Sequence, residues 1–250
     1  MVIEEKGLEY IDKKDIFSKQ DYFDVLKCNG YKKTQDSFLV SFQKLVNDGL
    51  VQRVGRNAYQ IARDNLYLYE YTYSNLANEV SKYINSNYSF MNYVIFETIQ
   101  LNEFINHQLG RNTIFIFVDN EVINFVFNTL KDTFKNKVML SPRIIEFNQY
   151  RSEDMIILRR LVSESPQNPK KLWYITLEKM LVDIMADSLI KETFSESEYK
   201  SIYENAFNKY IVDESKMFRY ARRRNVADKI KNFIKNETNI MLKTEDKDDK

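Results

Sequence analysis

Apolar residues at the start of the chain recur every three or four positions, which is the period of an amphipathic helix. This spacing predicts helices over Leu8–Phe17 and Ser18–Lys27, and the Asn29-Gly30 pair that follows is typical of a helix C-terminus. A third apolar stripe then predicts another helix. The stripe consists of Phe38, Leu39, Phe42, Leu45 and Val46.

The pattern then changes to two short runs rich in β-branched and aromatic residues, Leu50–Val54 and Ala58–Ile61. The turn Gly55-Arg56-Asn57 between them predicts a β-hairpin. Three helices followed by a hairpin form the pattern of a winged helix-turn-helix. Residues 8–61 are therefore predicted to be a small DNA-binding module.

The remaining chain alternates strand-like and helical segments and ends in a helical third. The predicted strands are Tyr93–Phe96, Thr113–Val118, Lys137–Leu140, Met155–Val162 and Trp173–Thr176. The predicted helices are Asn75–Ser86, Glu121–Phe134, Leu177–Ile190, Ser195–Tyr210, Glu214–Arg224 and Val226–Lys235. This order favours an α/β (α+β) second domain. We expect a winged-helix domain at 1–62, a linker at 63–74, an α/β domain at 75–240 and a disordered charged tail at 241–250.

Composition narrows the function classes. A chain of 250 residues with 44% hydrophobic residues can build two folded domains. One Cys and one His make a Cys/His metal site unfavourable, and 5 Gly cannot supply a Gly-rich phosphate loop, so we expect neither metal nor cofactor. The polar first residues and the absence of an 18-residue apolar run predict a cytoplasmic protein that does not enter the membrane.

The predicted third helix and the hairpin carry the residues expected to contact DNA. These are Lys32, Lys33, Thr34, Gln35, Ser37, Ser41, Lys44, Arg53, Arg56 and Asn57. From Gly30 to Ile61 five cations face two carboxylates, a local charge of only +3. Because this charge is modest, useful affinity should need two modules, as a homodimer on a repeated or inverted site. The alternative is that the winged helix binds protein.

Acid–base chemistry has one candidate group in the second domain. Glu97 follows a predicted strand, and Glu103 and His107 come soon after it. A carboxylate and an imidazole this close could transfer a proton. The alternative is a structural polar cluster that holds the loop before the strand Thr113–Val118. Its members would be Glu97, Asn102, His107 and Arg111.

A metal-dependent enzyme is the alternative function for this domain. Asp183 and Asp187 stand four residues apart on a predicted helix, with Glu178 before them. Carboxylates at such spacing could hold Mg²⁺ and act on nucleic acid or nucleotide. The competing interpretation is an ion-paired helix face.

Positive charge is densest near the C-terminus. Between Lys216 and Lys235 eight cations face one carboxylate, in a chain whose net charge is +1. The predicted patch for a partner or nucleic acid consists of Arg219, Arg222, Arg223 and Arg224. Alternatively, these arginines pair with acids of their own domain, such as Glu192, Glu196 and Glu198.

Four segments carry a family resemblance. KLVNDGLVQRVGRNAYQI resembles the winged module of abortive-infection type E antitoxins, the regulator half of type IV toxin–antitoxin systems. The segments YVIFETIQLNEFINHQLGRNTIFIFV, TLEKMLVDIMAD and KMFRYARRRN resemble the body of a bacterial family grouped with those antitoxins.

The resemblance implies a transcription regulator that binds operator DNA and represses its own operon. It also implies a role in phage defence, by counteracting a nucleotidyltransferase-type toxin without a stable complex being required. It assigns no catalytic residue, so no enzyme activity is expected from it. The family's basic pattern falls on Arg219 and Arg222–Arg224, and its helix pattern on Glu178, Lys179, Asp183 and Asp187.

Overall fold

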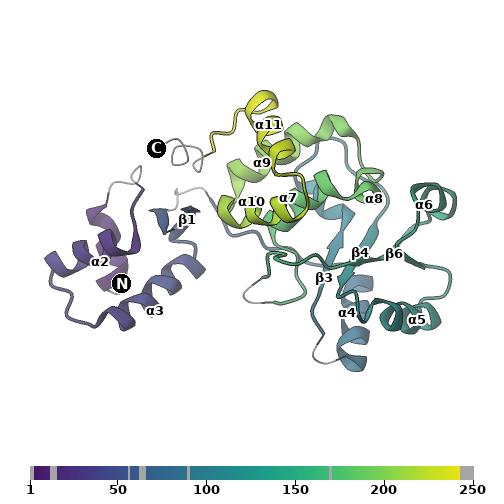
Figure 1. Ribbon diagram of the computed structural model, residues 1–250, viewed down its shortest axis with the longest axis horizontal. Coiled ribbons are helices and arrows are strands. Elements are labelled where there is room, and N and C mark those ends of the chain that lie inside the picture. The colour runs from purple at the N-terminus through teal and green to yellow at the C-terminus, as the bar shows by residue number, and fades with distance from the viewer. Residues whose placement is uncertain are drawn as a thin grey trace. The chain divides into compact units, whose positions relative to one another are not determined.

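The computed structural model describes residues 3–11, 16–55, 57–61, 66–88, 91–168 and 171–242 and has a mixed α/β architecture (Figure 1). The chain divides into two compact units. The first contains the residues up to Tyr69, the segment Ala206–Lys216 and the residues from Ile240 on, and the second contains Glu70–Asn205 and Met217–Asn239. No helix in the described part of the chain is long and apolar enough to cross a bilayer.

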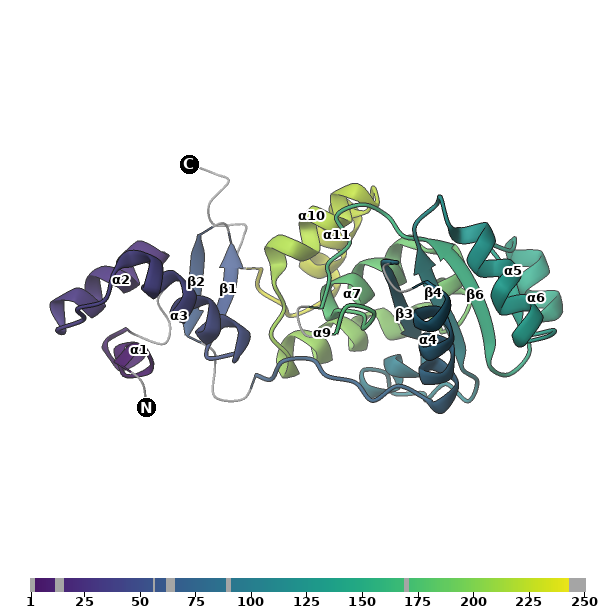
Figure 2. The ribbon, with the colours of Figure 1, turned by 90° about the horizontal axis from the view of Figure 1, so that it is seen from below.

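Two helices and a hairpin dominate the first unit (Figure 2). Its elements are α1 (Ile3–Lys6), η1 (Gly7–Tyr10), α2 (Lys19–Cys28), α3 (Gln35–Asn47), β1 (Val51–Gly55) and β2 (Ala58–Ile61). Ser18 begins α2 in a capping box with Asp21, and the Thr34 hydroxyl caps α3 by accepting the Ser37 N–H. Aromatic rings fill the core between these elements, with Phe42 and Tyr59 edge to face at 4.8 Å.

The predicted helix Leu8–Phe17 is wrong. The 3-10 turn η1 ends at Tyr10, residues 12–15 lie outside the described residues, and Phe17 is extended. Phe17 exchanges two backbone hydrogen bonds of 2.8 Å with Tyr59 and thereby forms an isolated β-bridge beside the hairpin. These bonds hold Phe17 outside any helix, although its side chain is buried as the apolar pattern indicates.

The hairpin is antiparallel, with Val51 opposite Ile61 and a register shift between Arg53 and Gly55. Asn57 takes a left-handed conformation with φ of 51°, which suits a tight turn. Within the same unit, the Tyr67 backbone bridges Tyr210. Part of the segment predicted as a linker is therefore hydrogen-bonded.

The second unit is built on a four-stranded mixed sheet of order β3-β4-β6-β5. The strands are β3 (Tyr93–Glu97), β4 (Thr113–Val118), β5 (Val138–Leu140) and β6 (Met155–Arg160). β3 is antiparallel to β4, whereas β4 and β5 both run parallel to β6. The strand β4, one of the two central strands, is buried along its whole length on both faces. The predicted strand Trp173–Thr176 is reduced to one bridge, between Tyr174 and Ile95.

Helices cover both faces of this sheet. Figure 1 shows α4 (Asn75–Asn87) and α5 (Ile123–Thr133) on one side of the strands, where they share a core with residues such as Ile116 and Leu158. α7 (Leu177–Ala186) and α8 (Ser188–Lys191) lie on the other side. The predicted single helix Leu177–Ile190 is split because Asp187 is extended and its side chain caps α8.

The remaining elements lie wholly or mostly in this unit, and only the end of α9 and the start of α10 fall in the first unit. They are η2 (Thr98–Glu103), α6 (Ile144–Tyr150), η3 (Glu196–Glu198), α9 (Tyr199–Lys209), α10 (Glu214–Arg223) and α11 (Ala227–Glu237). The short elements η2 and α6 were not expected from the sequence. Tyr73, inside the segment predicted as a linker, is buried in the core beside α4, and its hydroxyl donates to the Ile95 carbonyl at 2.7 Å.

Candidate functional sites

The turn between α2 and α3 places exposed polar groups beside the N-terminus of α3. Lys32, Lys33, Thr34 and Gln35 are all exposed there, next to the first N–H groups of the helix. The Lys27 ammonium donates to the Lys33 carbonyl at 3.3 Å and adds a cation to this end. Ammonium groups and helix N–H groups both attract phosphate, so this end of α3 has the chemistry of an anion-binding surface.

The face of α3 that points away from the core is polar with one apolar residue. Lys44 and Asn47 are exposed, and Val40 is 74% exposed between them and the N-terminus. Gln43, which the sequence analysis did not single out, is also exposed and donates to Asn47 at 3.0 Å. Ser37 and Ser41, which were predicted to contact DNA, lie at the side of this face and are half-buried.

The hairpin holds three of the residues predicted to contact DNA, of which Arg53 and Asn57 lie in the described part of the chain. Arg56 lies outside the described residues, and Arg53 is half-buried. The Asn57 amide oxygen accepts the Lys19 backbone N–H at 3.4 Å, which ties the turn to the start of α2. The Lys19 ammonium lies 5.8 Å from the centres of the Phe42 and Tyr59 rings, so it adds a cation that the sequence analysis did not identify.

The predicted C-terminal arginine patch separates into two groups. Arg219, Arg222 and Arg223 are exposed on one side of α10. Arg219 lies 3.6 Å from the Glu164 carboxylate, and Arg223 donates to the Ser163 hydroxyl at 2.7 Å. Among the described residues, these exposed arginines contact Glu164 and Ser163 of their own domain and not the expected Glu192, Glu196 or Glu198. Arg224 is 12% exposed and turns inward, so its assignment to the patch was wrong.

Arg224 belongs to a buried charge network with both helix aspartates. Asp183 accepts from the Lys179 ammonium at 2.7 Å and the Tyr220 hydroxyl at 2.9 Å, and Arg224 lies 3.1 Å away. Asp187 pairs with Arg159 at 2.8 Å. Lys179 also lies 4.0 Å above the Phe117 ring. Burial lowers the pKa of Lys179, although the Asp183 carboxylate opposes that shift.

This network occupies the carboxylates that a metal enzyme would need. Asp183 and Asp187 are 1% and 2% exposed, and their oxygens face cations and hydrogen-bond donors of the same unit. No group of three or more His, Cys, Asp or Glu residues suited to a metal occurs among the residues that the structure describes. The arrangement matches the ion-paired interpretation of this helix.

Glu97 is fully buried at the start of α4. Its carboxylate accepts the Ser74 N–H at 2.9 Å and the Asn112 amide at 2.7 Å. Ser74 is the N-cap of α4, so the helix N-terminus stabilises the negative charge. Glu97 therefore anchors β3 to α4 and to the start of β4.

His107 pairs with Glu198, an acid that the sequence analysis did not connect with it. Its Nδ1 lies 2.7 Å from the Glu198 carboxylate, which also accepts the Asn106 N–H. The hydrogen bond with His107 is the main cause that lowers the pKa of Glu198. Asn102 instead bonds both backbone groups of Leu109. The predicted four-residue polar cluster is thus divided into separate contacts.

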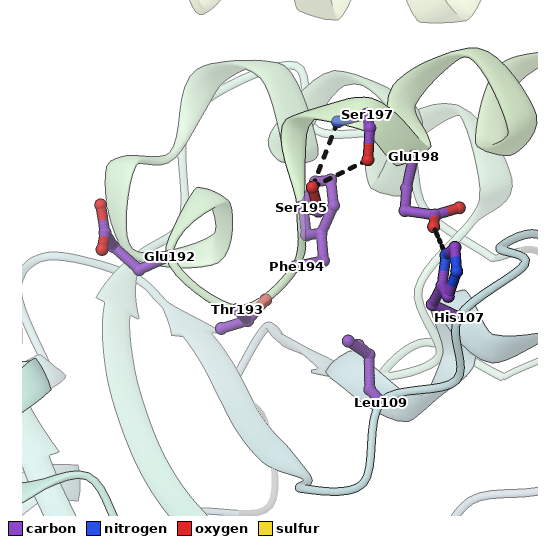
Figure 3. Close-up of a pocket in the computed structure, with 8 residues that line it drawn as sticks. All are labelled: His107, Leu109, Glu192, Thr193, Phe194, Ser195, Ser197 and Glu198. Atoms are coloured by element: carbon purple, nitrogen blue, oxygen red, sulfur yellow. Dashed lines mark hydrogen bonds and ion pairs between the residues drawn. The ribbon is translucent and has the colours of Figure 1, made fainter.

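A pocket of about 550 Å³ opens beside this pair (Figure 3). Its lining consists of His107, Leu109, Glu192, Thr193, Phe194, Ser195, Ser197 and Glu198. The hydroxyls of Ser195 and Ser197 lie 2.8 Å apart and bond each other. The polar side chains of the pocket mostly satisfy one another, and the His107 side chain is 90% exposed. The pocket therefore gives little support for an active site. The exposed cations and helix N-terminus of α3 give stronger support for anion binding.

Comparison with known proteins gives a family and a distant similarity to solved structures. No curated protein matches the chain significantly. Among solved structures, the crystal structure of the RV2827C protein from Mycobacterium tuberculosis is similar, with 12% identity, a TM-score of 0.23, and 88% of this chain and 79% of that chain covered. A similarity at this level carries no argument about function. Residues 37–240 match DUF6577, a family of unknown function, and since they make up more than half of the chain, the protein belongs to that family.

Proposed function

We propose that α2, α3 and the β1–β2 hairpin form a winged helix-turn-helix that binds operator DNA. The observation that carries the proposal is the exposed face of α3. Lys32 and Lys33 lie just before its N-terminus, and Lys44 lies in its last turn. A helix with such a face fits the major groove, where its cations contact phosphates and its polar side chains contact base edges.

The second part of the proposal is that the chain is a cytoplasmic regulator of the antitoxin type, which counteracts a nucleotidyltransferase-type toxin through its second unit. This part rests on the resemblance to abortive-infection type E antitoxins. The exposed arginines Arg219, Arg222 and Arg223 support it, because guanidinium groups on one helix side suit a phosphate-bearing or acidic partner.

Charge reversal of Lys44 tests the DNA part. Lys44 lies in the last turn of α3 and Lys131 in the last turn of α5, and both are exposed. Lys44→Glu removes a phosphate contact and adds repulsion, so we expect at least about a tenfold loss of affinity for duplex DNA from upstream of the gene at low salt. Lys131→Glu is the matched control and should bind like the wild type. Equal binding by the two variants in a gel-shift titration would contradict the proposal.

The antitoxin part is tested by co-expressing Lys44→Glu and an arginine double variant with a nucleotidyltransferase-type toxin gene adjacent to the gene of this chain; the absence of such an adjacent gene would contradict this part. Lys44→Glu should still restore growth, because it leaves the second unit unchanged, whereas Arg219→Glu combined with Arg222→Glu should fail to restore growth while retaining DNA binding. If the double variant rescues growth as well as the wild type does, the arginines have no part in neutralisation.

A further inference from the structure

Val40 is an apolar residue on the exposed face of α3, so it can neither pair with a phosphate nor hydrogen-bond to one. Asp36, Val40, Gln43, Lys44 and Asn47 recur at helical spacing and share the face opposite the buried Phe38, Phe42 and Leu45. Val40 lies at the middle of this face and is 74% exposed, more than the neighbouring Leu39 at 41%. Its two methyl groups project where a helix in the major groove would meet base edges.

Base chemistry assigns a partner to such a side chain. In the major groove, thymine alone presents a C5 methyl group, and apolar side chains make their favourable base contacts there. Guanine is read mainly by arginine or lysine, and α3 contains no arginine and one lysine, Lys44. Gln43 and Asn47, held together by their hydrogen bond, have the amide groups that pair with adenine.

We infer that Val40 reads the C5 methyl group of a thymine near the centre of each operator half-site. The inference rests on the proposed DNA binding and specifies the base pair under the middle of α3 as A·T. The cations Lys32, Lys33 and Lys44 position the helix on phosphates, and Val40 adds sequence discrimination that none of them supplies.

The test removes one methyl group at a time from the DNA. The full chain first selects duplexes from a random 20-base-pair library, and each thymine of the enriched sequence is then replaced by deoxyuridine, which differs from thymidine only in lacking the C5 methyl. One position per half-site should cost the wild type about fourfold in affinity, the value expected for losing one buried methyl contact. All other replacements should be close to neutral.

Val40→Ala completes a double-mutant cycle. Alanine has a higher helix propensity than valine, so α3 should remain folded. This variant should bind the thymine duplex about fourfold more weakly than the wild type and should no longer distinguish it from the deoxyuridine duplex. Ile145→Ala is the matched control, because Ile145 is a 75% exposed apolar residue on α6.

The outcomes of these experiments distinguish a failure of the proposed DNA binding from a failure of the proposed thymine contact. If no duplex is enriched, the proposed DNA binding fails, and the thymine contact fails with it. If a duplex is enriched but every deoxyuridine replacement is neutral for the wild type, DNA binding stands and the thymine contact is wrong. A deoxyuridine effect that persists unchanged in Val40→Ala would likewise assign the methyl contact to another residue.

Discussion

Ionisable side chains of the second unit form both buried and exposed ion pairs, and the residue type alone does not tell which. Lys179 is fully buried with its ammonium on the Asp183 carboxylate, while Arg219 is 57% exposed and its pairing with Glu164 is screened by water. The buried pair lies where removal of either partner leaves an uncompensated charge in a low-dielectric interior. Asp183 therefore stabilises the fold mainly by neutralising the charges of the buried Lys179 and the mostly buried Arg224.

Replacing Asp183 by asparagine should reveal that role. Asp183→Asn keeps the size of the side chain but leaves Lys179 and Arg224 without their nearest counter-charge. We expect a loss of about 3 kcal/mol in the free energy of unfolding, measured by urea denaturation. Asp132→Asn, an isosteric change at an exposed position of α5, should stay within about 0.5 kcal/mol of the wild type. Similar urea denaturation curves for the two variants would show that the buried charge network does not stabilise the fold.

Sequence patterns could predict part of these sites. The helical spacing of Arg219, Arg222 and Arg223 identified a shared exposed side, and the cluster Lys32–Gln35 was located correctly at the start of α3. Arg224 was misplaced because charge density ignores that it directly follows the last residue of α10, four residues after the buried Tyr220, where its side chain turns inward. The Glu198 partner of His107 is 91 residues away in sequence, a distance that local spacing cannot bridge.

At the scale of elements, apolar periodicity predicted the long helices and strands better than the segments around their ends. α4 and β4 match their predicted ranges closely because their apolar patterns are long and their neighbours bury them. The predicted helix Leu8–Phe17 failed because pairing with Tyr59 overrides the local pattern at Phe17. The split between α7 and α8 follows from an Asp187 side chain that caps a new helix, which periodicity does not register.

At two helix C-termini, a single glycine with a positive φ determines where the helix ends. Gly30 follows α2 with φ of 88°, its N–H donates to the Lys27 carbonyl at 3.1 Å, and the next N–H reaches back to Leu26 at 3.0 Å. These two bonds form a Schellman motif, which requires a left-handed residue at this position. Gly49 after α3 repeats the arrangement with φ of 75°.

Alanine at Gly30 should measure the strain of that conformation. A Cβ atom at Gly30 or at Gly110 would meet nothing within 4 Å, but only Gly30 of the two has a positive φ. Gly30→Ala should therefore lower the free energy of unfolding by about 1–2 kcal/mol, through backbone strain alone. Gly110→Ala should be neutral or slightly stabilising, since it restricts the unfolded chain. The comparison needs only two urea titrations, and equal midpoints would rule out strain at the end of α2.

At the scale of the whole molecule, charge limits how one copy could hold DNA. The net charge of the chain is +1, so no long-range positive field helps binding. The proposed DNA-binding face offers Lys32, Lys33 and Lys44 as exposed cations, and each phosphate contact contributes about 0.9 to the salt slope. A few contacts of this kind give weak affinity, and two copies on adjacent half-sites would double them.

We therefore predict two chains on each selected duplex, with half-sites separated by about one helical turn, or 10 base pairs. Light scattering of the complex should give the mass of two chains plus the DNA. Inserting 5 base pairs between the half-sites rotates one of them by about half a turn, so affinity should fall at least about tenfold, whereas inserting 10 should restore most of it by returning both half-sites to one face of the duplex. A complex with the mass of one chain, or an affinity indifferent to the 5-base-pair insertion, would show instead that a single copy of the α3 face suffices.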